Sequence, residues 1–172
     1  MSFISKTQGK GYEAGYFLAN NEDVTRETRE ASANSALVVT EANGTKYLPA
    51  GTAYPTNDGN AIGIVYEDVD VSDGNMPASI VTKGEIYEDK LAITATSYDA
   101  VTPVGTENPS EKGWYERSGT EGSYVYTLTT DTTVDSEKTY YEYVITRLAS
   151  SAKSALTSLG FKFKTSPTIT RP

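Results

Sequence analysis

Few residues in this 172-residue chain have types and spacing suited to chemistry. Ser150-Ser-Ala-Lys153 has the Ser-x-x-Lys spacing in which a lysine activates a serine nucleophile. The Ser-Asp-Asn and Lys-Thr-Gly elements that accompany such a nucleophile are absent from the sequence. We therefore interpret these four residues as part of the polar face of a short helix.

Carboxylates alternate with apolar residues in Asp68-Val-Asp-Val-Ser-Asp-Gly74, a pattern that superficially resembles a calcium-binding loop. Counting from Asp68, the position that requires Gly holds Asp73, and the position of the closing bidentate Glu holds Ser79. The alternation with Val69 and Val71 favours a strand with one solvent-facing side that ends in a turn. A weak calcium contact is the alternative.

The third candidate group is aromatic and lies between residues 98 and 144. Aromatic platforms with nearby acids bind the apolar faces of sugars, so these side chains are candidates for an outward-facing surface. A module of fewer than about 50 residues also needs its large side chains to exclude water, and we favour that interpretation. The residues concerned are Trp114, Tyr115, Tyr140 and Tyr141, with Tyr143 beside them.

Composition excludes several classes of function. The chain contains no Cys and no His, which removes disulfides, thiolate metal sites and the side chain that titrates near neutral pH. A formal net charge of -8 argues against sequence-independent nucleic-acid binding, which needs clustered Lys and Arg. No apolar run is long enough for a signal peptide or a membrane span. We expect a non-enzymatic protein without a cofactor, made in a cytoplasm.

The elements that position these groups are expected to be mainly β. Residues 1–35 are polar with scattered aromatics and predict an extended arm that becomes ordered on another surface. Apolar stretches at 36–39, 62–66, 79–82 and 91–95 predict short strands, and Asn43-Gly44 is one of the turn signals between them. The apolar residues of the arm are Phe3, Ile4, Tyr12, Tyr16 and Phe17.

Residues 98–144 differ from the rest and predict a small inserted β module. They hold the only Trp, seven of the 13 Tyr, and nine acidic against three basic residues. Ser110-Glu-Lys-Gly-Trp-Tyr-Glu116 is echoed by Ser136-Glu-Lys-Thr-Tyr-Tyr-Glu142. Aromatic and Thr-rich strands of this kind stabilise a small sheet through cross-strand pairs.

After the module, residues 147–159 predict one amphipathic helix that ends at Gly160. Phe161-Lys-Phe163 predicts a last short strand. We expect residues 36–97 and 145–172 to form one small β domain with a short C-terminal helix, interrupted by the module.

The order of these segments resembles the head decoration proteins of tailed bacteriophages, of the lambda type. The resemblance lies in Lys46-Tyr-Leu-Pro-Ala-Gly-Thr-Ala-Tyr-Pro55, Asn57-Asp58, Ala61 to Val71 and Gly84 to Leu91, followed by the helix and the Phe-x-Phe strand. It covers residues 36–97 and 145–164. The module and the long arm have no counterpart in the minimal family pattern.

The resemblance implies a β-tulip-like fold and a structural role on the virion. Family members bind the outer surface of the expanded head as trimers at threefold and quasi-threefold positions, and stabilise it without catalysis. The implied partners are the major capsid protein and further copies of the chain, with the arm as the capsid-binding segment. Residues 98–144 would then project outward and offer a surface for weak contact with a glycan or the host.

Two alternatives stay open from the sequence. One is an adhesion or carbohydrate-binding module on a virion that uses the Trp and Tyr side chains of residues 98–144. The other is a tail protein or another structural protein of the virion, which would have the same β-rich composition.

Overall fold

The computed structural model describes residues 14–104 and 106–167, and it is mainly β with one α-helix, as the sequence predicts. The chain divides into two compact units. Unit 1 comprises Met1–Thr94 and Arg147–Pro172, and unit 2 comprises Ala95–Thr146. Unit 2 is a few residues longer than the expected 98–144 because its first and last strands pair with each other out to Ala95 and Thr146. No helix among the described residues is long and apolar enough to cross a membrane.

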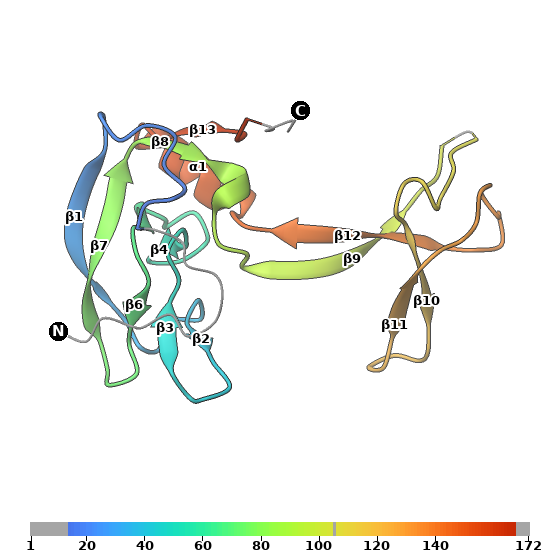
Figure 1. Ribbon diagram of the computed structural model, residues 1–172, viewed down its shortest axis with the longest axis horizontal. Helices are drawn as coiled ribbons and strands as arrows, with labels where there is room; N and C mark the ends of the chain where they lie inside the picture. Colours follow the sequence, from blue (N-terminus) through green and yellow to red (C-terminus); the bar gives the residue numbers. More distant parts are fainter. Residues whose placement is uncertain (1–13, 105, 168–172) are drawn as a thin grey trace, which may run out of the picture. The chain divides into compact units, whose positions relative to one another are not determined.

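Unit 1 is built on a four-stranded antiparallel sheet in the order β1-β7-β5-β4 (Figure 1). A three-stranded sheet has the order β2-β3-β6, and β13 pairs with β8 in parallel. The strands of unit 1 are β1 (Thr25–Ala31), β2 (Val39–Thr40), β3 (Lys46–Leu48), β4 (Ala53–Tyr54), β5 (Gly63–Val65), β6 (Val69–Asp70), β7 (Met76–Lys83), β8 (Glu85–Tyr87) and β13 (Lys162–Lys164).

The centre of the four-stranded sheet, at β5 and the middle of β7, is buried on both faces, which explains the uninterrupted apolar run in β5. Ile64 pairs with Val81 on one face, and Val65 pairs with Ile80 on the other. All four side chains are fully buried, and they belong to two separate hydrophobic clusters. A sheet covered on both sides requires apolar residues at consecutive positions instead of alternate ones.

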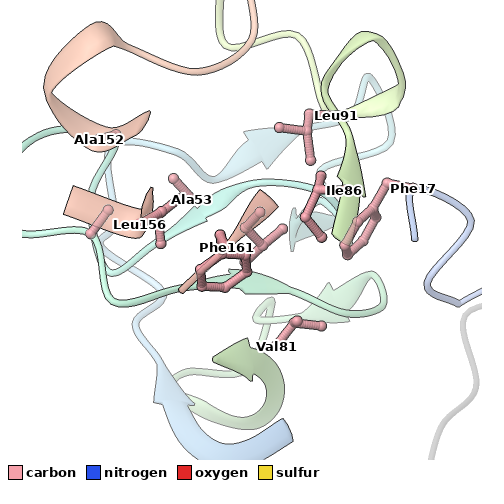
Figure 2. Close-up of a cluster of buried hydrophobic side chains, with 10 residues drawn as sticks. Phe17, Ala53, Val81, Ile86, Leu91, Ala152, Leu156 and Phe161 are labelled. Atoms are coloured by element: carbon pink, nitrogen blue, oxygen red, sulfur yellow. The ribbon is translucent and has the colours of Figure 1, made fainter. Parts of the chain in front are cut away.

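The first cluster joins segments that are distant in the sequence (Figure 2). Phe17 comes from the N-terminal segment, Ile86 from β8, and Leu156 from the helix beyond unit 2. The full cluster is Phe17, Ala53, Ala61, Ile64, Val81, Ile86, Leu91, Ala152, Leu156 and Phe161. Both halves of unit 1 are therefore required to complete its main core.

The second cluster lies between the four-stranded and three-stranded sheets. Leu48 from β3 and Val69 from β6 pack with Val65 and Ile80. Val69 and Val71 are buried while Asp70 between them is only half-buried, so the predicted strand with one solvent-facing side is confirmed at this point.

The only α-helix of the described residues is α1 (Ser150–Ser158), within the predicted range. Ala152 and Leu156 are its buried residues and face the first cluster. Gly160 ends the helix at a φ of 98°, a left-handed conformation that favours Gly, and its N–H donates to the Thr157 carbonyl at 3.0 Å. Phe161 is then buried and leads directly into β13.

Two predicted strands are wrong. Residues 91–94 form a connection after the 3₁₀ turn η1 (Glu88–Lys90), because their backbone groups bond to a loop and a side chain, and Ala95 already belongs to the next strand. The Leu91 carbonyl accepts from Arg147 Nη1 at 2.5 Å, and the Ala92 N–H donates to the Gly51 carbonyl at 3.2 Å. Residues 36–38 are likewise irregular, and only Val39 of that stretch belongs to a strand.

Unit 2 is a four-stranded antiparallel sheet in the order β11-β10-β12-β9. Its strands are β9 (Ala95–Val101), β10 (Tyr115–Ser118), β11 (Val125–Leu128) and β12 (Tyr140–Thr146). The two copies of the sequence repeat lie side by side in it, since Tyr115 pairs with Tyr141 and Glu116 with Tyr140. The internal repeat of the sequence thus corresponds to neighbouring strands.

Replacing Leu156 with Ala should lower the free energy of unfolding of unit 1 by about 2–5 kcal/mol, the usual cost of removing a buried leucine side chain. Leu159→Ala is the matched control, because Leu159 lies at the end of the same helix and is 49% exposed. Urea titration followed by far-ultraviolet circular dichroism measures both changes. Equal losses of stability in the two variants would contradict the packing described for α1.

Candidate binding surfaces

Residues 14–19 belong to the fold of unit 1, so the expected arm of residues 1–35 is wrong for its second part. Phe17 is fully buried, its carbonyl accepts from the Tyr87 N–H at 2.8 Å, and Ala19 donates to the Glu85 carbonyl at 2.8 Å. Tyr16 is half-buried and meets the Phe17 ring edge-on, with the centroids 5.7 Å apart. Burial makes Phe17 unable to contact a capsid. Phe3, Ile4 and Tyr12 lie outside the described residues.

The next part of the expected arm forms an edge strand. Strand β1 pairs with β7 along one side, from Thr25 opposite Lys83 to Ala31 opposite Met76. Its outer side pairs with no other strand in the described part of the chain. All residues of β1 except Ala31 are exposed. Unpaired backbone groups at such an edge are a template for adding a further strand.

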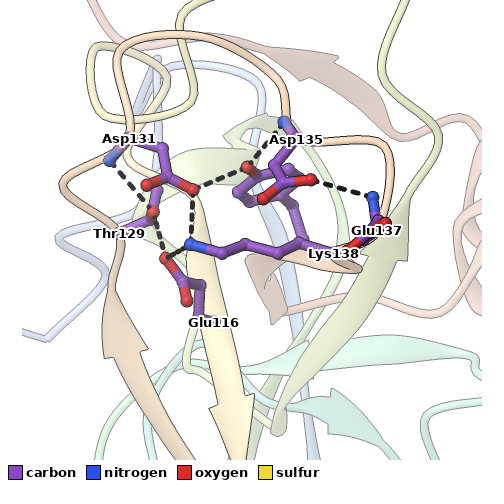
Figure 3. A network of polar contacts seen from close by, with 7 residues as sticks. Glu116, Thr129, Asp131, Asp135, Glu137 and Lys138 are labelled. Carbon is purple, nitrogen blue, oxygen red and sulfur yellow. Dashed lines mark hydrogen bonds and ion pairs between the residues drawn. The ribbon is translucent and has the colours of Figure 1, made fainter.

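A network of charged and polar side chains joins the strand ends in unit 2 (Figure 3). Lys138 Nζ lies 2.8 Å from Asp131 Oδ2 and 3.3 Å from Glu116 Oε1. The Tyr140 hydroxyl donates to Asp131 Oδ2 at 2.7 Å and accepts from the Asp135 N–H at 3.1 Å. Thr129 Oγ1 donates to Glu116 Oε1 at 2.5 Å. Lys138 in the second copy of the sequence repeat thereby forms an ion pair with Glu116, the last residue of the first copy.

The network shifts the pKa values of its members in opposite directions. Hydrogen bonds from the Lys138 ammonium and the Tyr140 hydroxyl lower the pKa of the Asp131 carboxyl. The same pairing with Asp131 raises the pKa of Lys138. Burial raises the pKa of the Tyr140 phenol, and its hydrogen bond to Asp131 adds to that effect. All three groups therefore keep their charge states at neutral pH, which suits a structural role.

The aromatic side chains of unit 2 mostly face one another. The Tyr98 and Tyr126 rings are stacked at a centroid distance of 4.0 Å, and Tyr115 meets Tyr98 edge-on at 5.0 Å. The Arg117 guanidinium lies over the rings of Tyr124 and Tyr141 at 4.2 and 4.9 Å. Ring faces that are already covered in this way are not open for stacking on a sugar.

The expected outward-facing surface of unit 2 is wrong for three of its four residues. Trp114 and Tyr141 are 6% and 7% exposed, and Tyr140 is fully buried. Trp114 packs against Tyr140 with the ring centroids 5.7 Å apart. Only Tyr115 is half-buried. A sheet this small has few aliphatic residues to bury, so its aromatic residues form the core, as the favoured interpretation of the sequence holds.

The remaining sequence candidates are engaged in structural contacts. Lys153 Nζ lies 2.5 Å from Glu88 Oε2, which links α1 to η1, and the Ser150 carbonyl accepts from Ser154 Oγ at 2.9 Å. The Asp68 carboxylate accepts from the Ala50 N–H at 2.8 Å, and Asp70 accepts from the Ser72 N–H at 2.9 Å. Among the described residues, no cluster of three or more potential ligands could hold a metal ion.

Sequence reasoning missed the exposed edge of β1. The stretch Thr-Arg-Glu-Thr-Arg-Glu has no apolar residue and so lacks the alternation that marks a strand with one buried face. The regular alternation of basic and acidic residues was the available signal, because opposite charges at short spacing suit an exposed strand.

Comparison with known proteins adds no family to this description. No protein-family model, curated protein or solved structure matches the chain. The function of the chain is therefore inferred from its own residues and contacts.

Acid should weaken unit 2 through Asp131. A carboxyl whose pKa is lowered by folding stabilises the fold above its unfolded pKa of about 3.9, and this contribution is lost as the pH falls through the folded-state pKa. We expect the urea concentration at the midpoint of unfolding of unit 2 to be lower at pH values below about 4 than at pH 7. Fluorescence of Trp114, the only Trp, measures that midpoint.

Asp131→Asn should lower the urea midpoint of unit 2 at pH 7. The further decrease of the midpoint on acidification should be smaller than in the unaltered protein, because residue 131 no longer titrates. Glu121→Gln, in the exposed turn between β10 and β11, is the matched control and should change neither value appreciably. A pH dependence in Asp131→Asn as steep as that of the unaltered protein would show that other carboxylates are responsible.

Proposed function

We propose that this chain is a head decoration protein of a tailed bacteriophage, which binds the outer surface of the expanded capsid as a trimer and stabilises it. The proposal rests on one observation: the segments that resemble the decoration family are the segments that build the core of unit 1. These buried residues are Leu48, Ala50, Ala53, Ala61, Ile64, Val65, Val69, Val71, Ile86 and Leu91.

The C-terminal part of the resemblance completes the same core. Leu156 from α1 and Phe161 before β13 belong to the same buried cluster as Ile86, and β13 runs parallel to β8 with Phe163 opposite Ile86. The family pattern is thus carried by residues that determine a fold, which is stronger support than a match confined to surface residues.

We confine the proposed capsid-binding segment to residues 1–13. Since residues 14–31 belong to unit 1, we assign the capsid-contacting role to residues 1–13, with Phe3, Ile4 and Tyr12 as its apolar anchors. Three such segments in one trimer act at a high effective concentration, so that individually weak contacts combine into slow dissociation. The major capsid protein is the proposed partner, and the head surface is the proposed location.

Unit 2 is proposed to be dispensable for attachment. It has its own sheet, its own aromatic core and its own polar network. Its two connections to unit 1 start from residues that are close together, because the Thr94 hydroxyl donates to the Arg147 carbonyl at 3.2 Å. Asn57 Nδ2 also donates to both, at 3.0 Å to Thr94 Oγ1 and 3.3 Å to the Arg147 carbonyl.

A pair of deletions tests the proposal on purified expanded heads that lack the protein. Removing residues 1–13 should abolish co-sedimentation with heads, because the proposed capsid contacts are lost. Replacing residues 95–146 with Asn-Gly should leave co-sedimentation intact, because a two-residue turn spans the short gap between Thr94 and Arg147.

Circular dichroism and thermal unfolding verify that both variants keep unit 1 folded. Retention of head binding after removal of residues 1–13 would refute the assigned segment. Failure of the unaltered chain to bind heads at all would refute the function. Loss of binding only on removal of unit 2 would favour the adhesion-module alternative.

A further inference from the structure

The outer edge of β1 has a charge order that is complementary to itself. Its sequence from Thr25 to Ala31 is Thr-Arg-Glu-Thr-Arg-Glu-Ala, and the first six side chains are exposed. If a second copy of β1 is laid antiparallel beside it with the two Thr28 residues opposite each other, Arg26 faces Glu30 of the second copy. In the same register Glu27 faces Arg29 of the second copy. Every charged residue of the strand then has an opposite charge across from it.

Neighbouring registers do not share this property. A shift by one residue places Arg26 opposite Arg29 in one direction, and Glu27 opposite Glu30 in the other. Centring the pair on Glu27 or on Arg29 places that residue opposite its own copy. Like charges directly opposite each other destabilise an antiparallel pair, whereas opposite charges stabilise it. The Thr28-centred register is therefore favoured over the four around it.

The geometry of β1 suits this register. Its pairing with β7 has one irregularity, between Thr25 and Arg26, and is regular from Arg26 to Ala31. The complementary charges lie entirely within the regular part, and the Glu30 backbone carbonyl there accepts from the Tyr54 hydroxyl at 3.0 Å. Figure 1 shows β1 at the margin of the four-stranded sheet.

Contacts within the molecule hold two of these side chains in place. The Arg26 guanidinium lies over the Tyr66 ring at 4.3 Å, and Glu30 Oε1 accepts from Asn75 Nδ2 at 3.0 Å. A guanidinium stacked on a ring still presents N–H groups at its rim to a carboxylate. Glu27 and Arg29 pair with each other at 2.5 Å on the same face, with side chains about half exposed, and would exchange this partner for one across the interface.

Charged residues on an edge strand also serve to prevent pairing, which is the alternative explanation of this sequence. Protection of that kind needs only charge, and a single sign would repel a second copy best. The strand instead carries two Arg and two Glu in an order that cancels when it meets itself. The order of the signs favours recognition over repulsion.

We propose that β1 is a self-recognition edge, through which two copies of this chain join by antiparallel strand addition about a twofold axis at Thr28. The contact is isologous, with the same residues used by both copies, and extends the four-stranded sheet of each unit 1 into its neighbour. The proposal is independent of the capsid function. On a decorated head, the contact would join copies from adjacent trimers.

Single cysteines test the register, because the chain has no Cys of its own. Thr28→Cys places two thiols opposite each other at the proposed axis, with a Cα separation of about 4.5–5.5 Å, which a disulfide bridges. Thr25→Cys is the matched control on the same strand, and its two thiols would lie about 20 Å apart. Under mild oxidation, Thr28→Cys should form a covalent dimer at least about tenfold faster than Thr25→Cys, as measured on non-reducing gels.

Charge variants in the Thr28→Cys background test the complementarity. One variant carries Arg26→Glu and Arg29→Glu, and the other carries Glu27→Arg and Glu30→Arg. Each alone opposes like charges in the proposed register and should cross-link several-fold more slowly than Thr28→Cys alone. An equimolar mixture opposes only unlike charges and should recover rapid cross-linking, exclusively between the two variants, which an affinity tag on one of them reveals.

The outcomes decide the proposal. Selective cross-linking of Thr28→Cys together with recovery on mixing supports it. Equal rates for Thr28→Cys and Thr25→Cys overturn it, even if the charge variants fail to fold, because those two variants keep all four charges. Slow cross-linking of the mixture of folded charge variants also overturns it, since charge complementarity would then not direct the contact.

Discussion

Burial of Ile86 by segments from opposite ends of the chain is the interaction on which unit 1 depends. Phe17 approaches it from the N-terminal side, and Leu156 and Phe161 approach it from beyond unit 2. The pairing of β8 with β13 fixes these segments at the backbone level. An insertion of some fifty residues between Thr94 and Arg147 is tolerated because these two residues are hydrogen-bonded to each other, so the core of unit 1 is completed without the inserted residues.

Unit 2 uses a different kind of stabilisation. It buries Trp114, Tyr140 and Tyr141 together with few aliphatic side chains, and its strand ends are tied by the network around Asp131. Aromatic pairs and charge-assisted hydrogen bonds are directional, so a small sheet built from them has a specific geometry without a large core. This difference explains why the only Trp and seven of the 13 Tyr lie in unit 2.

The sequence predicts the locally encoded features well. The helix that ends at Gly160, the buried run through Ile64 and Val65, and the mainly β composition all follow from periodicity and turn residues. Long-range features are not predicted in this way. Phe17 is interpreted from the sequence as an arm residue because the other buried residues of its cluster begin only at Ala53, 36 residues further along the chain (53 - 17), and its neighbour Leu18 bridges to Ile86. The apolar residues that start at Leu91 predict a strand. The prediction fails because the Leu91 carbonyl accepts a hydrogen bond from Arg147 instead of from a neighbouring strand.

The candidate surfaces follow the same division. Burial of Trp114 and Tyr140 is foreseeable from the size of the module, whereas for the exposed edge of β1 the sequence offers only the order of its charges, and the pairing with β7 establishes the edge.

The junction around Asn57 has a consequence for protein engineering. Its amide nitrogen contacts both Thr94 and Arg147, and its amide oxygen accepts from the Ala149 N–H at 2.9 Å. The Asn57 side chain thus holds together the two points at which the chain leaves unit 1 and returns to it. Foreign domains whose termini lie next to each other are suited to insertion between Thr94 and Arg147, which makes unit 1 a carrier for antigens, enzymes or fluorescent proteins.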